Sequence, residues 1–424
     1  MTSPVRPPLG SSVSTTDPTT APPPLELADG RPAVAAWSLD PAVKHLNHGS
    51  FGAVPLLAQE EQNRLRRQME ASPVEWFPAL PGKVAAARNT IAGFLRVAVD
   101  DLALVPNASA GASVVYGNAP ARPGGEVVVT DHGYGAVTMG AERLARRWGG
   151  RVRTAHVPLD ADADTAYECV VGALGEATGL LVIDHITSAT ARWMPVARIA
   201  AAARERGIPV LVDGAHVPGL ADDPLDGLHC DFWIGNLHKF GCAPRGAAAL
   251  VARTPLREDL HPLIDSWGAG EPFPDRFDTQ GTVDATSYLA TPTALGFIED
   301  TWGWGTARTY MRALADYAEG IIGAAFSELT GENCRVDVGM PVSALRLVRI
   351  PAPLAATHAE ADALRDRVAR ELGVAAAFTS FGGVGYLRLS THVYNTAADF
   401  EYFAEHCVPV LGAWSRNRSD GGQR

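Results

Sequence analysis

The chain of 424 residues is too long for one ordinary hydrophobic core, so we expect one large domain and one smaller domain. Its composition, with 46% hydrophobic and 20% charged residues, is typical of a globular protein. The formal net charge of −11 excludes nucleic acid and an anionic membrane as the main partner, because both need a basic protein face.

The first 34 residues are rich in proline, serine and threonine, as in TTAPPP at residues 19–24. Such a segment buries too little apolar area to offset the entropy that ordering would cost, so we predict a disordered tail over residues 1–34. The tail also lacks the apolar stretch of a secretory signal. We therefore expect the folded chain to begin near residue 35.

Short apolar runs and longer helical patterns alternate over residues 35–292. Apolar positions 84, 87, 91, 94 and 95 indicate one face of a helix. Buried strands are predicted at 102–105, 126–130, 179–184, 208–213, 232–234 and 247–251, with helices at 136–148 and 196–206. Most strand positions are apolar, which is typical of strands covered on both faces. This repetition predicts an α/β domain with a mostly parallel central sheet.

The pattern changes after about residue 292. A long helical region is predicted at 294–329, followed by a strand at 344–350, a helix at 358–372, a strand at 386–390 and a helix at 397–411. These elements predict a smaller α+β domain over residues 293–424. No run of about 18 apolar residues is present, so we expect no membrane span.

The chain has five scattered cysteines and no C-x-x-C pair. An odd number without paired spacing favours neither a disulfide framework nor a zinc site, so we predict a cytoplasmic protein without a metal. The cysteines are Cys169, Cys230, Cys242, Cys334 and Cys407.

Lys239 is the most informative single residue. It follows the strand predicted at 232–234, in the segment GNLHKFG at residues 235–241, and strand ends are where α/β sheets build their sites. Partial burial lowers the pKa of a lysine, and its neutral amine then condenses with an aldehyde. For an isolated lysine, the alternative is a solvated surface position.

Two neighbouring segments suggest which aldehyde this is. Asp213 ends an apolar run in LVDGAH at residues 211–216, and a carboxylate beside a pyridine nitrogen makes the ring of pyridoxal 5'-phosphate (PLP) an electron sink. The small residues at 108–113 follow a strand and open a helix, whose free N–H groups bind a phosphate. Taken singly, Asp213 also fits a helix N-cap and the small residues a plain turn. Together with Lys239 they predict PLP as the cofactor.

Four motifs resemble the class V aminotransferase family of fold-type I PLP enzymes, which includes the cysteine desulfurases. They are LNHGSFG at 46–52, VDGAHVPG at 212–219, GNLHK at 235–239 and LRLS at 387–390. The likeness spans roughly residues 40–412 and is greatest to the isopenicillin N epimerase-like branch, which also holds C–S lyases such as hercynylcysteine sulfoxide lyases. It implies a large PLP-binding α/β domain, whose N-terminal segment contacts the small α+β C-terminal domain.

The resemblance implies a role for each matching position. Lys239 is expected to carry the cofactor as a Schiff base and to move the Cα proton, with Asp213 at the pyridine nitrogen and His216 near the ring hydroxyl. The positions expected at the phosphate are Asn236, His238 and the backbone of Ala108, Ser109 and Ala110.

Four further positions follow from the same resemblance. Thr187 and Ser188 are expected to contact the ring or the substrate. Gly281 and Thr282 match a loop that reaches the phosphate of a neighbouring subunit. The expected functional unit is therefore a homodimer whose active site is shared between subunits.

Tyr134 and Arg388 complete the expected site. Tyr134, in DHGYGA at residues 131–136, matches the aromatic residue that stacks on the ring; His132 is the alternative, and many relatives carry Glu where Gly133 stands. Tyr134 also fits a packed core aromatic. Arg388 is expected to bind the α-carboxylate of an amino-acid substrate with its guanidinium fork, and a structural ion pair is the alternative.

Several reactions at Cα stay open. We expect epimerisation, which needs a second acid such as His48, Tyr134 or a water, and consider a C–S lyase as the alternative, with transamination third.

Other classes of protein are disfavoured. A desulfurase needs a nucleophilic cysteine in the small domain, but residues 374–386 contain none, and Cys242 is expected to be packed. A non-catalytic PLP-fold binding protein is disfavoured by the intact set of Lys239, Asp213 and Arg388. No GxGxxG follows an early strand, which excludes a dinucleotide-dependent dehydrogenase.

Overall fold

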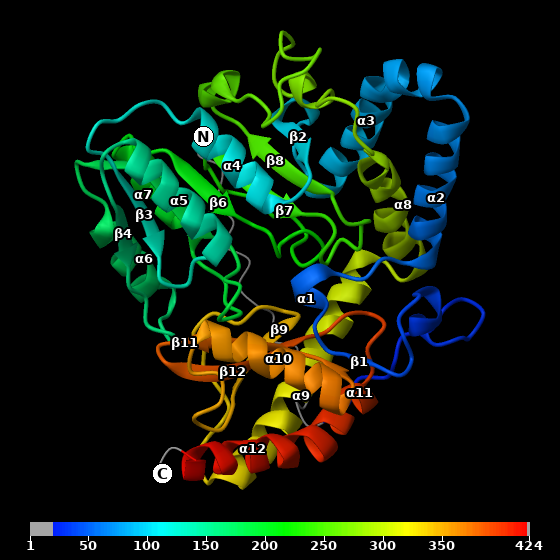
Figure 1. Ribbon diagram of the computed structural model, residues 1–424, viewed down its shortest axis with the longest axis vertical. Helices are drawn as coiled ribbons and strands as arrows, with labels where there is room; N and C mark the ends of the chain where they lie inside the picture. Colours follow the sequence, from blue (N-terminus) through cyan, green and yellow to red (C-terminus); the bar gives the residue numbers. More distant parts are fainter. Residues whose placement is uncertain (1–19, 422–424) are drawn as a thin grey trace, which may run out of the picture.

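A seven-stranded sheet forms the centre of the large domain in the computed structural model, which describes residues 20–421 (Figure 1). Its strands are β2 (Leu102–Val105), β3 (Glu126–Thr130), β4 (Val152–Ala155), β5 (Thr178–Asp184), β6 (Val210–Asp213), β7 (Phe232–Asn236) and β8 (Ala248–Ala252). They lie in the order β2-β8-β7-β6-β5-β3-β4, and β8 alone runs antiparallel to its neighbours. The mostly parallel sheet predicted from the sequence is therefore confirmed.

Helices cover both faces of this sheet. One face packs against α4 (Ala108–Asn118) and α5 (Gly135–Arg147), the other against α3 (Pro73–Leu95), α6 (Ala163–Ala173) and α7 (Val196–Glu205). Alternate residues of each strand enter the two cores: Leu102 and Leu104 one, Ala103 and Val105 the other. Both sides of the strands are dry, so the central positions of most strands are apolar. The edge strand β4 differs, because its Arg153 and Thr154 are exposed, and no apolar run marked it in the sequence.

Long helices connect the large domain to the small one. The expected helical region 294–329 is two helices, α8 (Thr286–Thr301) and α9 (Trp304–Thr330), separated at Gly303, whose φ of 77° leaves the helical region. The expected domain boundary at residue 292 falls inside α8. This helix packs on α3 and on α2 (Leu56–Ala71), at the right in Figure 1.

The small domain contains the antiparallel sheet β11-β12-β9, which lies below the large sheet in Figure 1. Its strands are β9 (Leu345–Arg349), β11 (Ala377–Phe381) and β12 (Val384–Ser390), and its helices are α10 (His358–Leu372), α11 (Ala397–Tyr402) and α12 (Val408–Gly421). The N-terminal strand β1 (Lys44–His45) pairs in parallel with β10 (Val374–Ala375). The segment before the large domain is thus attached to the small one, as expected.

The predicted disordered tail is too long. Residues 1–19 lie outside the described residues, but residues 20–34 contact the folded body. Leu25 packs against the hydrophobic cores, and the carbonyl of Glu26 accepts a hydrogen bond of 2.7 Å from Trp302 Nε1. The side chain of Leu25 and the half-buried indole of Trp302 thus attach this proline-rich stretch to the folded body. Over residues 20–421, no helix has both the length and the apolar character required to span a membrane.

Candidate functional site

The carboxyl ends of β5, β6 and β7 bring the predicted site together. Asp213 is the last residue of β6, and Lys239 lies in the loop after β7. Both side chains are buried, with 3% and 9% exposed. Each charge acts on the pKa of the other, so the two groups lie near each other. Asp213 accepts a hydrogen bond of 2.9 Å from the N–H of Ala215.

The amine of Lys239 loses its proton more easily than an ordinary lysine. Burial, helped by the cation of Arg388, lowers the pKa of Lys239 to about 7, so a large share of the amine is uncharged near neutral pH. Nε2 of His216 lies 3.1 Å from the lysine Nζ and 3.0 Å from the carbonyl oxygen of Gly49. That oxygen only accepts, so we assign the ring proton to Nε2. The amine then faces an N–H group, which it can accept only when uncharged.

A short helix, α1 (His48–Phe51), packs against the loop that carries this amine. His48 Nε2 donates to the carbonyl of Lys239 at 3.0 Å, while the Gly49 carbonyl accepts from His216. Gly52 ends the helix with a φ of 69°, and a Cβ there would overlap the carbonyl oxygen of His238. Only glycine therefore lets this segment approach the lysine loop so closely.

His48 is not a substrate group, contrary to expectation. Its two ring nitrogens are used inside the protein: Nε2 by Lys239, and Nδ1 by the hydroxyl of Tyr394 at 3.0 Å. Burial lowers the pKa of His48 to about 3, so it cannot act as an acid near neutral pH. The motif that suggested a substrate contact positions the lysine instead.

His48, His392 and Cys242 form a buried cluster whose nitrogen and sulfur atoms lie close enough for a metal site. The two imidazole rings are stacked, with centroids 3.9 Å apart and planes 16° from parallel. Lone pairs in nearly parallel planes do not converge on one ion, and both nitrogens of His48 are already used. The cluster is therefore a packed polar core, with Cys242 fully buried as expected.

Arg388, on β12, is a buried guanidinium without an acidic partner within residues 20–421. It donates to the carbonyl and hydroxyl oxygens of Ser188 at 2.7 and 3.2 Å, to Ser50 Oγ at 3.0 Å and to Asn47 Oδ1 at 3.3 Å. Its buried Nε has no hydrogen-bond partner in the structure. Burial lowers the pKa of Arg388 to about 10, yet it stays charged at neutral pH. Within residues 20–421 no structural ion pair forms at Arg388, and its unpaired Nε–H can donate to an anion.

The expected phosphate cradle at the start of α4 is partly occupied by the protein itself. The N–H of Ala108 donates to Asn236 Oδ1 and that of Ala110 to the N-cap Asn107, both at 2.8 Å. Of the three expected backbone donors, only the N–H of Ser109 is not taken by a side chain. His238 is tied to the carbonyl of Ala247 at 3.0 Å, with its pKa lowered to about 4 by burial. Within residues 20–421, the amide nitrogen of Asn236 donates to no other protein group, while its Oδ1 accepts from Ala108.

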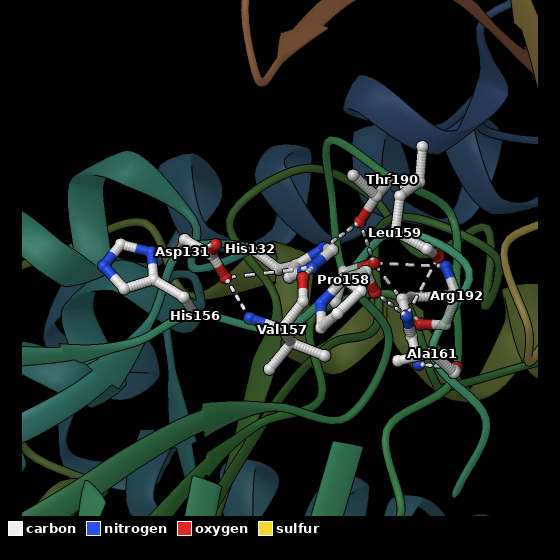
Figure 2. A network of polar contacts seen from close by, with 10 residues as sticks. Asp131, His132, His156, Val157, Pro158, Leu159, Ala161, Thr190 and Arg192 are labelled. Atoms are coloured by element: carbon white, nitrogen blue, oxygen red, sulfur yellow. Dashed lines mark hydrogen bonds and ion pairs between the residues drawn. The ribbon is translucent and has the colours of Figure 1, made fainter. Parts of the chain in front are cut away.

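Thr187 and His132 belong to the wall of the site. Thr187 accepts from the N–H of Arg192 at 3.1 Å, and its hydroxyl lies 2.7 Å from that of Thr190. Thr190 bonds His132 Nδ1 at 2.7 Å, while His132 Nε2 donates to the carbonyl of Val157 at 2.8 Å (Figure 2). The ring of His132 also packs on Phe381, 4.4 Å away. This chain uses the hydroxyl of Thr187 and both nitrogens of His132, so the expected contact of Thr187 with ring or substrate is not supported.

Arg192 fastens the loops of this wall. It donates to the carbonyls of Pro158, Leu159 and Ala161 at 2.6–3.0 Å, as Figure 2 shows.

Tyr134 differs from the residues of this wall, because 46% of it is exposed and it acts electrostatically on Arg388. The geometry therefore favours Tyr134 over His132 as the aromatic group that faces a ligand.

Gly281 and Thr282 lie apart from the lysine. Both are exposed and line a cavity of about 690 Å³ together with Pro106, Arg245 and Trp267. Lys239 does not line this cavity. Within a single chain, Gly281 and Thr282 therefore lie outside the site around Lys239.

Three functional residues were missed in the sequence. Asn47 and Ser50 hold Arg388, and no local pattern in LNHGSFG indicated this contact across 338 residues. Asp184 could have been found: it ends the predicted strand 179–184 with an acid, the same signal that marked Asp213. The two aspartates are direct partners in the parallel register of β5 and β6.

Known proteins resemble this chain in both sequence and fold. The family model for aminotransferase class-V matches residues 80–403. Isopenicillin N epimerase of Streptomyces clavuligerus is 30% identical over 408 residues, which cover 92% of this chain and 100% of the epimerase. That of Amycolatopsis lactamdurans is 31% identical, over 87% and 95%. An L-cysteine desulfhydrase of Arabidopsis thaliana is 27% identical over 60% of each chain.

Two solved structures show the same fold at lower identity. C-DES with glycine covalently linked to its PLP cofactor matches with a TM-score of 0.74 at 18% identity, over 90% of this chain and 99% of its own. The complex of the cystine C-S lyase C-DES with its product cysteine persulfide matches with a TM-score of 0.72 at 19% identity, over 87% and 97%.

Proposed function

Because the chain belongs to the class-V aminotransferase family, whose members depend on PLP, we propose that it epimerises an amino-acid substrate at Cα. One observation carries the proposal: a buried amine with a lowered pKa lies near a buried acid and near an arginine that has no acidic partner. Epimerisation is favoured because both isopenicillin N epimerases align with at least 87% of the chain.

The residues of the site fit PLP. The neutral amine of Lys239 suits an aldehyde, and the buried carboxylate of Asp213 suits a pyridine nitrogen. The free N–H of Ser109 and the amide of Asn236 suit the phosphate, while His216 lies where it can contact the ring hydroxyl. When bound, PLP supplies an aldehyde for amines and a ring that stabilises negative charge at Cα.

The protein's own groups then orient the substrate and move the proton. The α-carboxylate pairs with the free Nε–H of Arg388 and replaces the long bond to Asn47. Nζ of Lys239 accepts the Cα proton, because a base whose pKa is near 7 can both take and return a proton at neutral pH. Ser188 keeps the guanidinium in place, which orients the bond to be broken.

Epimerisation also needs a proton donor on the opposite face. His48 is ruled out by its partners and low pKa. The half-exposed Tyr134, close enough to affect Arg388, is our proposed donor through its hydroxyl.

Solvent exchange tests the proposed reaction. We expect the PLP-bound protein, incubated in D₂O with isopenicillin N or a panel of amino acids, to introduce deuterium at Cα and to invert the centre. In Tyr134→Phe, exchange should continue while inversion slows by about 10²-fold, because only the second proton transfer is lost. Chiral chromatography and mass spectrometry measure the two rates. Exchange without any inversion in the unmodified protein would contradict epimerisation.

A C–S lyase is the second candidate. The Arabidopsis desulfhydrase and the C-DES fold favour it, because both proteins are named for cleavage of cysteine or cystine. The same incubation with cysteine or thioethers distinguishes it, since a lyase releases sulfide or thiol and leaves no epimer. Within residues 374–386 no cysteine is present, so a desulfurase mechanism lacks its nucleophile there.

The proposed functional unit is a homodimer. Beside the exposed Gly281 and Thr282, the side chains of Leu263, Ile264 and Trp267 face solvent, and Trp267 is 98% exposed. Such apolar side chains are typical of protein interfaces. Sedimentation should give a dimer, and Trp267→Asp should shift it toward monomer, while Met139→Ser on α5 leaves it unchanged. A monomeric unmodified protein would exclude a shared site.

A cytoplasmic location stays a prediction, which cell fractionation would test.

A further inference from the structure

A second buried acid lies beside Asp213. Asp184 and Asp213 are the last residues of the neighbouring parallel strands β5 and β6 and face each other in register. Register partners in a parallel sheet lie about 4.8 Å apart, and their side chains point to the same face. Only 6% of Asp184 and 3% of Asp213 is exposed. The site therefore holds two adjacent carboxyl groups.

The surroundings do not neutralise two anions. Within residues 20–421 neither acid forms a salt bridge. The charged and titratable groups that act on Asp184 are Asp213, Lys239 and the buried phenol of Tyr116. Lys239 has a pKa of about 7 and supplies at most a partial charge near neutral pH. Two adjacent buried carboxylates share one proton under these conditions, as paired acids do in general.

The two acids have similar surroundings. Asp213 accepts the N–H of Ala215, the backbone N–H of Tyr134 faces Asp184, and both acids lie near the lysine amine. Burial and the neighbouring Asp213 raise the pKa of Asp184 well above the ordinary value. The cationic ring nitrogen proposed at Asp213 distinguishes the two acids, because it holds Asp213 ionised and leaves the shared proton on Asp184.

We infer that Asp184 keeps a proton in the resting holoenzyme, so that Asp213 is the single anion of the pair, and that Asp184 also positions Tyr134 through its backbone N–H. This inference rests on the proposed place of Asp213 at the ring nitrogen. Asp184 is a positioning residue: it acts on the cofactor through Asp213 and on the second proton donor through Tyr134.

Gly133 shows how closely the Tyr134 loop is packed on this acid. A Cβ at Gly133 would lie 3.8 Å from Asp184 Oδ2 and 3.0 Å from both the Thr130 carbonyl and Thr138 Oγ1. The small glycine therefore lets the Tyr134 loop pass close to Asp184, where the backbone N–H of Tyr134 faces the acid.

Infrared difference spectroscopy of the holoenzyme tests the proton directly. A protonated carboxyl group has a carbonyl stretch separate from that of carboxylates, and we expect one such band at neutral pH that disappears in Asp184→Asn. Asp164→Asn is the control, because Asp164 is an exposed partner of Arg198 and should leave the band unchanged. Persistence of the band in Asp184→Asn would overturn the assignment of the proton.

Two variants separate the protonated acid from a mere packing role. Asparagine is neutral like the protonated acid and still accepts from Tyr134, so Asp184→Asn should keep the bound-cofactor spectrum and a kcat within about threefold. Asp184→Ala should slow inversion by about tenfold or more while Cα exchange continues, because the loop anchor is lost. Loss of cofactor in Asp184→Asn would mean that the anion at 184 is needed, which overturns the inference. Absence of inversion with an intact infrared band would instead contradict the proposed function alone.

Discussion

Replacing Lys239 by alanine is expected to remove the visible absorbance of the lysine-bound cofactor and to lower kcat by about 10³-fold, because the proton-transferring base is lost. PLP itself should still bind through its other contacts, at reduced affinity. Absorbance spectra of purified protein and Cα exchange rates measure the two effects.

The sequence provides a clean control for this result. The chain has only three lysines, Lys44, Lys83 and Lys239. Lys44 pairs with Asp399, and Lys83 lies over the ring of Trp76, so their amines are occupied on the surface. Borohydride reduction followed by peptide mapping should label Lys239 alone, and Lys44→Ala and Lys83→Ala should stay yellow. A label on either of those lysines would contradict the assignment.

The pH dependence of cofactor uptake follows from the same amine. The pKa of Lys239 is lowered from 10.5 to about 7, so the reactive neutral form dominates above pH 7 and is lost as the pH falls below it. Uptake of PLP by the apoprotein should therefore decrease about tenfold per pH unit below pH 7 and level off above it. A surface lysine, with an ordinary pKa, would still be mostly protonated at pH 9, so PLP uptake would continue to rise above pH 7.

Replacing Arg388 by alanine is expected to raise the KM for amino-acid substrates by about 10²-fold, because loss of one partner of a buried charged hydrogen bond costs about 3 kcal/mol. The cofactor should stay bound, since Arg388 contacts none of the groups proposed to hold it. Steady-state kinetics and the bound-cofactor spectrum measure both parts.

Two variants sharpen the Arg388 prediction. Arg388→Lys keeps the charge but not the planar fork, and should give an intermediate KM. Arg198→Ala removes an exposed arginine paired with Asp164, and it should change neither the KM nor the bound-cofactor spectrum. In Arg388→Ala the pKa of Lys239 should also rise, because the cation that helps to depress it is gone. An unchanged KM for every amino acid would exclude the carboxylate role.

The fold was predictable where burial or helix capping produces a recognisable pattern of residues within one segment of the sequence. The predicted strands 102–105 and 126–130 agree with the observed β2 and β3, because both faces are buried and the central positions are apolar. The helix 358–372 was also placed correctly, since Thr357 and Glu360 form a capping box and Gly373 ends the helix with a φ of 65°. Strand β4 was missed because edge exposure removed the apolar signal.

The candidate site was predictable only as a set of residue types. Strand ends and motifs selected Lys239, Asp213 and Arg388, and the structure brings these three together. The same reasoning assigned ligand roles to Thr187 and His48, whose polar atoms form hydrogen bonds within the protein. It also overlooked Asp184, although that residue carried the same strand-end signal as Asp213.

By itself the sequence determined most strands of the large sheet, the location of the amine and the class of cofactor, because each depends on local periodicity or on short motifs. Only the tertiary structure decided which polar groups remain free for a ligand. Hydrogen-bond partners of a buried atom come from elements that meet only after folding, such as α1, the lysine loop and β12. That is why His48 became a support for the lysine, and why Arg388 was left with an unpaired Nε–H.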